Sequence, residues 1–263
     1  MVVLQQFGIL FVLGSLGVVL IGITSIPQIQ QQLATLPAIA VADLPPLWVI
    51  MALQGLQSLF LLAIASLVGI FCTRSIGLRS HLIDAWVFHA PKMAAFGTEL
   101  KWSLGVGAIT TIVALSIDRL MTPLLPKALQ TANQAAPNWL ASLTGLLYGG
   151  ITEEILMRWG LMSLLVWVGW KVLKHGVALP SQSIYQGAIV LAALIFGLLH
   201  LPATAAFAPL TSWVILRAII LNGIVGIGCG WLFWQYSLEA AMISHASFHA
   251  IIFVLNGVLT RQG

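Results

Sequence analysis

Apolar residues in this chain form long uninterrupted runs separated by short polar stretches. The runs consist of Leu, Ile, Ala, Gly and Trp and lack the period-two alternation of a lipid-facing barrel strand. Most of them are long enough to cross a hydrocarbon core of about 30 Å as a helix. The clearest spans cover residues 7–24, 47–72, 102–117, 139–173, 185–201, 213–234 and 238–255. The pattern predicts an all-α polytopic membrane bundle of seven or eight transmembrane helices.

The region 139–173 leaves the number of crossings open, because 35 residues exceed one crossing at a rise of about 1.5 Å per residue. It is either one long helix or two helices broken near Gly149 and Gly150. The single helix gathers most basic residues on the side of the N-terminus, which the positive-inside rule then makes cytoplasmic. The residues on that side are Arg74, Arg79, Lys92, Lys101, Lys171 and Lys174, and those opposite are mainly Arg119, Lys127 and Arg261.

Composition supports an integral membrane protein without a soluble domain. The 263 residues are 60% hydrophobic and only 7% charged, whereas soluble domains carry about 25% charged residues. The net charge of +4 comes from basic residues spread over loops, which excludes nucleic acid as a partner. Cys72 and Cys229 lie far apart in apolar runs and form no CxxC motif, so we expect packing roles. The first run lacks a basic lead-in and a cleavage site, which predicts a retained helix.

Ionisable residues at membrane depth are costly, so those that occur there are functional candidates. The predicted spans contain Glu153, Glu154, Arg158, His200, Arg217, His245 and His249. We expect Arg217, about one turn inside its span, to extend its side chain to the interface. Each of the others has a structural alternative, an ion-paired helix contact or a hydrogen-bonded core histidine. Their joint presence on three helices favours a functional site.

The sequence "EEILMR" combines two adjacent carboxylates with an arginine. Glu154 and Arg158 are four residues apart, so they meet on one helix face. Glu153 is rotated from Glu154 by about 100° and points elsewhere. One carboxylate is thus a partner for arginine, and the other is a candidate general base acting on water. His245 and His249 also share a helix face and can both point into one cavity.

Other intramembrane hydrolase types lack their motifs here. A serine type needs a small-residue loop such as G-x-S-G, and an aspartyl type needs G-x-G-D, but "GIGCG" at 226–230 precedes no Asp. A zinc type needs H-E-x-x-H, whereas "HASFH" has Ala246 in place of the base. A glutamate and histidine type remains.

These residues resemble the CPBP intramembrane proteases, a family that includes the CAAX prenyl endopeptidases and the Abi bacteriocin-processing proteins. The family motif E-E-x-x-x-R matches Glu153, Glu154 and Arg158, and F-x-x-x-H matches Phe196 and His200. The last helix of the family carries H-x-x-x-N or H-x-x-x-D. Here "HASFH" has His245 in the histidine place and departs from the motif with histidine at position 249.

The resemblance implies an intramembrane endopeptidase, a hydrolase in which Glu153 and His200 activate a water molecule. His245, with His249, would stabilise the oxyanion or hold the water, and Glu154, Arg158 and Phe196 would support the site. The preferred interpretation requires no cofactor. The alternative is Zn²⁺ bound by Glu153, His200, His245 and His249. The implied partners are the lipid bilayer and a membrane-embedded or lipid-modified protein or peptide.

The resemblance divides the chain into variable N-terminal helices and loops (1–138), a CPBP-like catalytic core (139–255) and a C-terminal tail (256–263). We expect a multi-pass protein of a prokaryotic inner or plasma membrane. Two alternatives stay open. A non-catalytic immunity or scaffold protein is suggested by His249, and a proton-coupled transporter by the buried Glu and His residues. The transporter is disfavoured because the clear candidates for intramembrane charge lie only in the second half.

Overall fold

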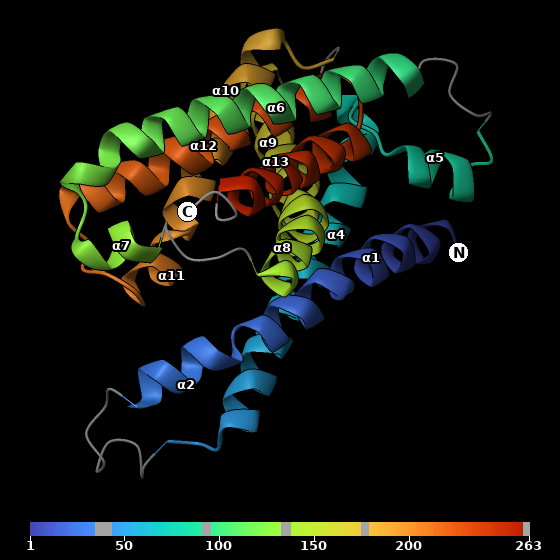
Figure 1. The fold of residues 1–263 in the computed structure, drawn as a ribbon. Helices are drawn as coiled ribbons and strands as arrows, with labels where there is room; N and C mark the ends of the chain where they lie inside the picture. The colour runs from blue at the N-terminus through green and yellow to red at the C-terminus, as the bar shows by residue number, and fades with distance from the viewer. Residues whose placement is uncertain (35–43, 91–95, 133–137, 175–178, 260–263) are drawn as a thin grey trace.

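A computed structural model describes residues 1–34, 44–90, 96–132, 138–174 and 179–259. The described residues form helices and no strand. Seven helices are long and apolar enough to span a membrane, and Figure 1 shows how they pack. They are Val2–Ala34, Leu47–Ile76, Phe96–Leu124, Trp139–Leu173, Gln182–Ala205, Ser212–Gln235 and Leu238–Val258. The predicted all-α polytopic bundle is confirmed, and the described residues contain seven candidate crossings.

The first three spans precede the motif helices. They comprise α1 (Val2–Thr24), its continuation α2 (Ile26–Ala34), α4 (Leu47–Ile76), α6 (Phe96–Met121) and the short 3₁₀ turn η1 (Thr122–Leu124). The short helices α5 (His81–Val87) and α7 (Lys127–Ala132) flank α6 in the chain. Helix α4 ends at Gly77 in the left-handed region, at a φ of 73°. Glycine adopts that conformation without steric cost, which explains the stop.

The fourth span changes its winding where the sequence suggested a break. It consists of α8 (Trp139–Thr144), the π-helical segments η2 (Gly145–Glu153) and η3 (Ile155–Met162), and α9 (Ser163–Lys174). Gly149 and Gly150 lie inside η2, so the chain widens to a π-helix there and continues in one direction. Such stretches are rare and are frequent at functional sites. The eight-helix alternative is therefore wrong.

The remaining spans wrap around this central helix. They are α10 (Gln182–Leu199) with the short α11 (Leu201–Ala205), α12 (Ser212–Gln235) and α13 (Leu238–Leu259). Segment η2 packs between α1 and α13, and η3 packs against α4. Helix α6 lies across α12 and α13 (Figure 1). Half of the most apolar stretch of the fourth span is buried inside the protein, a larger share than in the other described spans. The helix that carries the Glu-Glu motif is thus the centre of the bundle.

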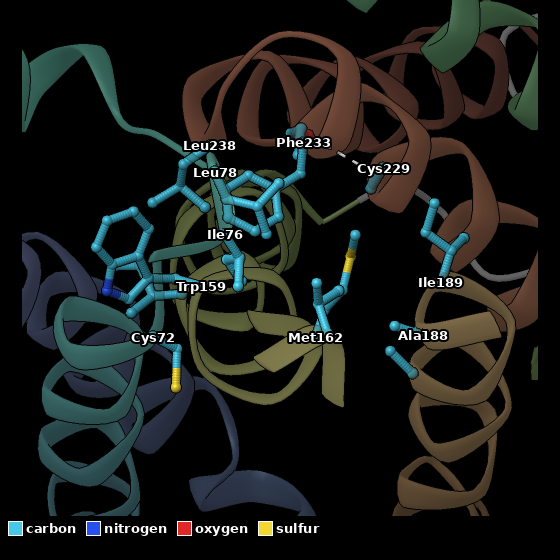
Figure 2. Close-up of a cluster of buried hydrophobic side chains, with 14 of the residues drawn as sticks. Cys72, Ile76, Leu78, Trp159, Met162, Ala188, Ile189, Cys229, Phe233 and Leu238 are labelled. Atoms are coloured by element: carbon cyan, nitrogen blue, oxygen red, sulfur yellow. Dashed lines mark hydrogen bonds between the residues drawn. The ribbon is translucent and has the colours of Figure 1, made fainter. Parts of the chain in front are cut away.

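The hydrophobic core gathers around η3 and α9 (Figure 2). Trp159 is 2% exposed, and its indole Nε1 donates to the carbonyl oxygen of Ser66 at 3.2 Å. Gly69 leaves room for this ring, since a Cβ there would lie 2.1 Å from it. Cys72 and Cys229 are buried and form no disulfide, which agrees with the expected packing roles.

A polar cluster holds α5 to the start of α13. The Glu239 carboxylate accepts hydrogen bonds from Ser80 Oγ at 2.6 Å, His81 N at 2.8 Å and Leu82 N at 3.1 Å. Arg79 donates from Nε to the carbonyl oxygen of Tyr236 at 3.0 Å. The segments that follow α4 and precede α13 therefore meet at one end, as the positive-inside topology requires.

The predicted membrane orientation rests on basic residues, and the side chains of three of them are not described by the structure. Lys92 and Arg261 lie outside the described residues, as does the side chain of Lys174. The cytoplasmic orientation of the N-terminus stays a prediction. Arg217 Nε lies 2.6 Å from Asp118 Oδ1 on α6. The side chain is thus paired with a carboxylate on the neighbouring helix, and its extension to the interface stays a prediction.

Helix α1 approaches η2 closely enough to require glycine. Thr152 Oγ1 donates to the carbonyl oxygen of Gly14 at 2.7 Å. A Cβ at Gly17 would lie 2.2 Å from Thr152 Oγ1 and 2.7 Å from Tyr148 Cα. Small residues at helix contacts let backbones approach in this way.

Gly17→Ala should lower the thermal midpoint of the purified protein, because overpacking a tight contact costs roughly 1–3 kcal/mol. Gly8→Ala is the matched control on the same helix, since a Cβ at Gly8 meets nothing within 4 Å. Both midpoints are measured by thermal unfolding in the same detergent. Equal midpoints for the two variants would contradict the close α1–η2 contact.

Candidate active site

Side chains from three helices meet in one cavity of about 200 Å³. Glu153 ends η2, His200 follows α10, and His245 and His249 lie on α13. The cavity is lined by Ile21, Thr144, Gly145, Tyr148, Gly149, Glu153, His200, Leu221, Asn222, Val225, His245, Phe248 and His249. The residues predicted to activate water and to stabilise the oxyanion are thus brought together, while Glu154 and Arg158 lie buried behind them.

Glu153 faces both of the nearer histidines. Its Oε1 lies 3.9 Å from His200 Nε2, and its Oε2 lies 4.0 Å from His245 Nε2. Its side chain is 16% exposed. Both separations exceed a direct hydrogen bond and suit a water molecule that bridges the two groups.

The other ring nitrogens determine what the histidines present to Glu153. His200 Nδ1 lies 2.8 Å from the carbonyl oxygen of Phe196, and His245 Nδ1 lies 2.7 Å from Glu154 Oε1. A carbonyl and an ionised carboxylate only accept, so each Nδ1 carries the hydrogen. In the neutral form of each ring, Nε2 then presents a lone pair toward the Glu153 carboxylate. In that form three acceptors converge, and a donor or a cation between them would satisfy them.

Glu154 and Arg158 form the buried support of this arrangement. Arg158 Nε lies 3.1 Å from Glu154 Oε2, a charge contact without the alignment of a hydrogen bond. Arg158 Nη2 donates to the carbonyl oxygen of Gly226 at 3.1 Å. The side chains of Glu154 and Arg158 are 0% and 2% exposed. The pair therefore holds a charged carboxylate in place to orient His245.

Phe196 contacts three members of the site. Its ring lies 4.6 Å from the His200 ring and 6.0 Å from the His245 ring, both edge to face. The Arg158 guanidinium carbon lies 5.1 Å from its centroid, a cation–π contact. The phenylalanine of the F-x-x-x-H motif thus forms an apolar wall that separates the arginine from the cavity histidines.

His249 occupies space that two glycines leave open. Its ring stacks on His245 at 5.0 Å between centroids and 19° between planes. A Cβ at Gly145 or Gly149 would lie 2.8 Å or 2.5 Å from the His249 ring. The glycines that precede the Glu-Glu motif therefore accommodate the residue at which this chain departs from the family pattern.

Two residues that line the cavity, Tyr148 and Asn222, were not predicted from the sequence, because the prediction rested on acidic, basic and histidine residues. Asn222 Nδ2 donates to the carbonyl oxygen of Ala218 at 2.8 Å. Its second N–H and its amide oxygen have no partner among the described residues. An uncharged carboxamide within an apolar helix was the only signal that could have marked Asn222.

The residue types that line the cavity include those that bind zinc. Carboxylate oxygen and imidazole nitrogen are zinc ligands, and the Nδ1 partners of His200 and His245 are of the kind that orient metal-bound histidines. Among the described residues, the group whose ligand atoms all lie within 4.8 Å of one another is Glu154, Cys229 and His245, and not the cavity set. That group is a poor zinc site, because His245 Nδ1 already donates to Glu154 Oε1 and the Arg158 guanidinium lies beside Oε2.

The comparison with family models identifies this part of the chain. Residues 135–251 match the model of the Rce1-like type II CAAX prenyl endopeptidases. The matched segment covers less than half of the chain and is similar to that family. No curated protein and no solved structure gave a match. The matched segment contains the E-E-x-x-x-R and F-x-x-x-H motifs and the last-helix segment with His245, so the suspected resemblance is confirmed. The candidate spans make the chain a multi-pass membrane protein, and the match supports an intramembrane protease at the level of the family.

Arg158→Leu should destabilise the fold by about 3–5 kcal/mol, because it leaves the Glu154 carboxylate buried without its counter-charge. Arg217→Leu is the matched control. It removes an arginine whose side chain is 20% exposed, so its cost should be smaller. Thermal unfolding and the yield of folded protein measure both. Wild-type stability in Arg158→Leu would refute the supporting role.

Proposed function

We propose that the chain is an intramembrane endopeptidase in which Glu153 and His200 activate a water molecule for attack on a peptide carbonyl. The convergence of the Glu153 carboxylate with the Nε2 lone pairs of His200 and His245 supports this proposal most directly. A water molecule supplies two of the hydrogens that these three acceptors lack. The family match supports peptide-bond hydrolysis as the reaction.

In the proposed reaction, the water donates hydrogen bonds to Glu153 and to His200 Nε2. Glu153 takes one proton as the water oxygen attacks the carbonyl carbon. Proton transfer of this kind contributes about 10²–10⁴ to a rate. Glu153 then passes the proton to the leaving nitrogen and the C–N bond breaks, which yields a carboxylic acid and an amine. The water oxygen remains in the new carboxyl group.

His245, His249 and Asn222 serve the tetrahedral intermediate. Glu154 fixes the orientation of the His245 ring, which places Nε2 beside the Glu153 carboxylate. His249 and Asn222 line the same cavity and offer N–H groups to the oxyanion. Asn222 supplies from α12 a carboxamide of the kind that the family usually has on the last helix.

Zinc is the alternative source of activation. A zinc ion held by Glu153, His200, His245 and His249 would supply Lewis-acid polarisation of the water or the carbonyl. We prefer the reaction without a cofactor, because Glu153 and the two Nε2 atoms are separated by distances that suit hydrogen bonds through a water.

The substrate we propose is a membrane-embedded or lipid-modified protein or peptide. The cavity is lined by residues of membrane-spanning helices, so a scissile bond must enter the bundle to reach Glu153. We place the protein in a prokaryotic inner or plasma membrane.

Glu153→Gln should lower proteolysis by ~10² or more, because an amide of the same size cannot take the proton. Stability should stay close to that of the wild type, since the residue forms no direct hydrogen bond in the fold. Cleavage of membrane-protein substrates by purified protein and thermal unfolding provide the two readouts. Undiminished cleavage by a folded Glu153→Gln variant would exclude Glu153 as the base.

His249→Asn should retain substantial activity if His249 donates to the oxyanion, since an amide can donate from the same place. If His249 binds zinc, the same change should reduce zinc content and activity together, because an amide nitrogen is a poor ligand. The measurements are metal content and cleavage with and without a chelator. An active variant insensitive to the chelator supports the mechanism without metal, and loss of both metal and activity overturns it.

A further inference from the structure

A second cavity of about 270 Å³ lies beside the catalytic cavity, between α1 and α4. Ile21 and Tyr148 line both cavities. Tyr148 precedes Glu153 by five residues in η2, so the two side chains lie on adjacent turns of the π-helix. A chain that occupied the second cavity would pass Tyr148 to reach the Glu153 carboxylate.

The wall that α4 contributes to this cavity carries unpaired carboxamides. Gln54 and Gln57 are one turn apart, line the cavity and are exposed. Neither has a hydrogen-bond partner among the described residues. Both lie in the membrane-spanning helix Leu47–Ile76. Polar groups without partners are unfavourable at membrane depth, so these glutamines indicate a ligand that hydrogen-bonds.

An extended polypeptide matches the chemistry of this wall. Peptide-bond hydrolysis requires a backbone carbonyl that a water can reach, and an extended segment exposes it. In lipid, each backbone N–H and C=O of such a segment would lack a partner, at a cost of several kcal/mol. A glutamine side chain offers both a donor and an acceptor and can satisfy either group.

We propose that the cavity between α1 and α4 binds an extended, uncharged stretch of substrate polypeptide next to the scissile bond, with Gln54 and Gln57 pairing to its backbone. The proposal rests on the proposed protease function and names the substrate element that this cavity takes. An isoprenoid or acyl chain would leave both carboxamides unsatisfied. The residues that line the cavity carry no charge, so a charged stretch would find no counter-ion there.

Photo-crosslinking tests binding separately from cleavage. The Glu153→Gln protein in lipid nanodiscs is irradiated with an uncharged apolar peptide of ~20 residues that carries a photoreactive diazirine leucine. A phospholipid with a diazirine in its acyl chain is the second probe. Mass spectrometry should place the peptide label on cavity residues within 18–25 or 51–61. The phospholipid should label the outer faces of α1 and α4 instead.

Gln54→Leu combined with Gln57→Leu should reduce peptide labelling roughly 30-fold, because two hydrogen bonds of about 1 kcal/mol each are lost and every 1.4 kcal/mol is tenfold. The variant removes polar groups from a membrane-spanning helix, so it should fold. The matched control is Gln30→Leu with Gln31→Leu on α2, two exposed glutamines that line neither cavity. The control should label as the unmodified protein does.

Phospholipid labelling of the cavity in place of peptide labelling would overturn the proposal, as would peptide labelling that the Gln54 and Gln57 changes leave intact. The protease function fails on a different result. Labelling that depends on Gln54 and Gln57, without any Glu153-dependent cleavage by the wild type, would keep the peptide site and reject the protease. Cleavage that depends on Glu153, without such labelling, would reject the peptide site alone.

Discussion

The buried chain of contacts from Arg158 through Glu154 to His245 is the constraint on which the site depends. An ionised carboxylate inside a membrane protein needs compensation on every side, because water is absent. Arg158 neutralises Glu154 from the same helix and also bonds the backbone of α12 at Gly226. Glu154 in turn fixes the His245 ring on α13. One compensated charge therefore ties three helices into the register that the cavity requires.

Close approach between helix backbones is the second constraint, and it shapes the cavity in which the charged side chains lie. Segment η2 lies between α1 and α13, in contact with both. Gly17 brings α1 against one side of η2, and Gly145 and Gly149 open the other side to the His249 ring. The π-helical winding turns successive residues by smaller angles than an α-helix does. Tyr148, Gly149 and Glu153 of this segment all line the cavity.

Local properties of the sequence predicted the spans and the Glu154–Arg158 pair. Hydropathy shows how long an apolar run is, and a spacing of four residues indicates that two side chains share a helix face. Hydropathy does not record winding, so it could not choose between a break and a π-helix at Gly149. The contact of Glu154 with His245 is tertiary, and its partner was not identifiable from spacing. Asn222 was missed because it is neutral, and the Asp118 partner of Arg217 because it lies on another helix.

Adjacent carboxylates have opposite environments because one residue step turns a helix by roughly 80–100°. Glu154 is fully buried between Arg158 and His245, whereas Glu153 reaches the cavity and forms no direct hydrogen bond with the described residues. The buried Glu154 carboxylate accepts the hydrogen bond from His245 Nδ1, so that Nε2 of the neutral ring is left as an acceptor. The wall of the second cavity that Gln54 and Gln57 form differs from these acceptors, since amides donate hydrogen bonds as well as accept them. A polypeptide that lies along that wall would be held by donors and acceptors up to Tyr148, and beyond it would meet the Glu153 carboxylate and the Nε2 acceptors of His200 and His245. These acceptors can bind a water molecule, and this separates substrate binding from water activation within one apolar bundle.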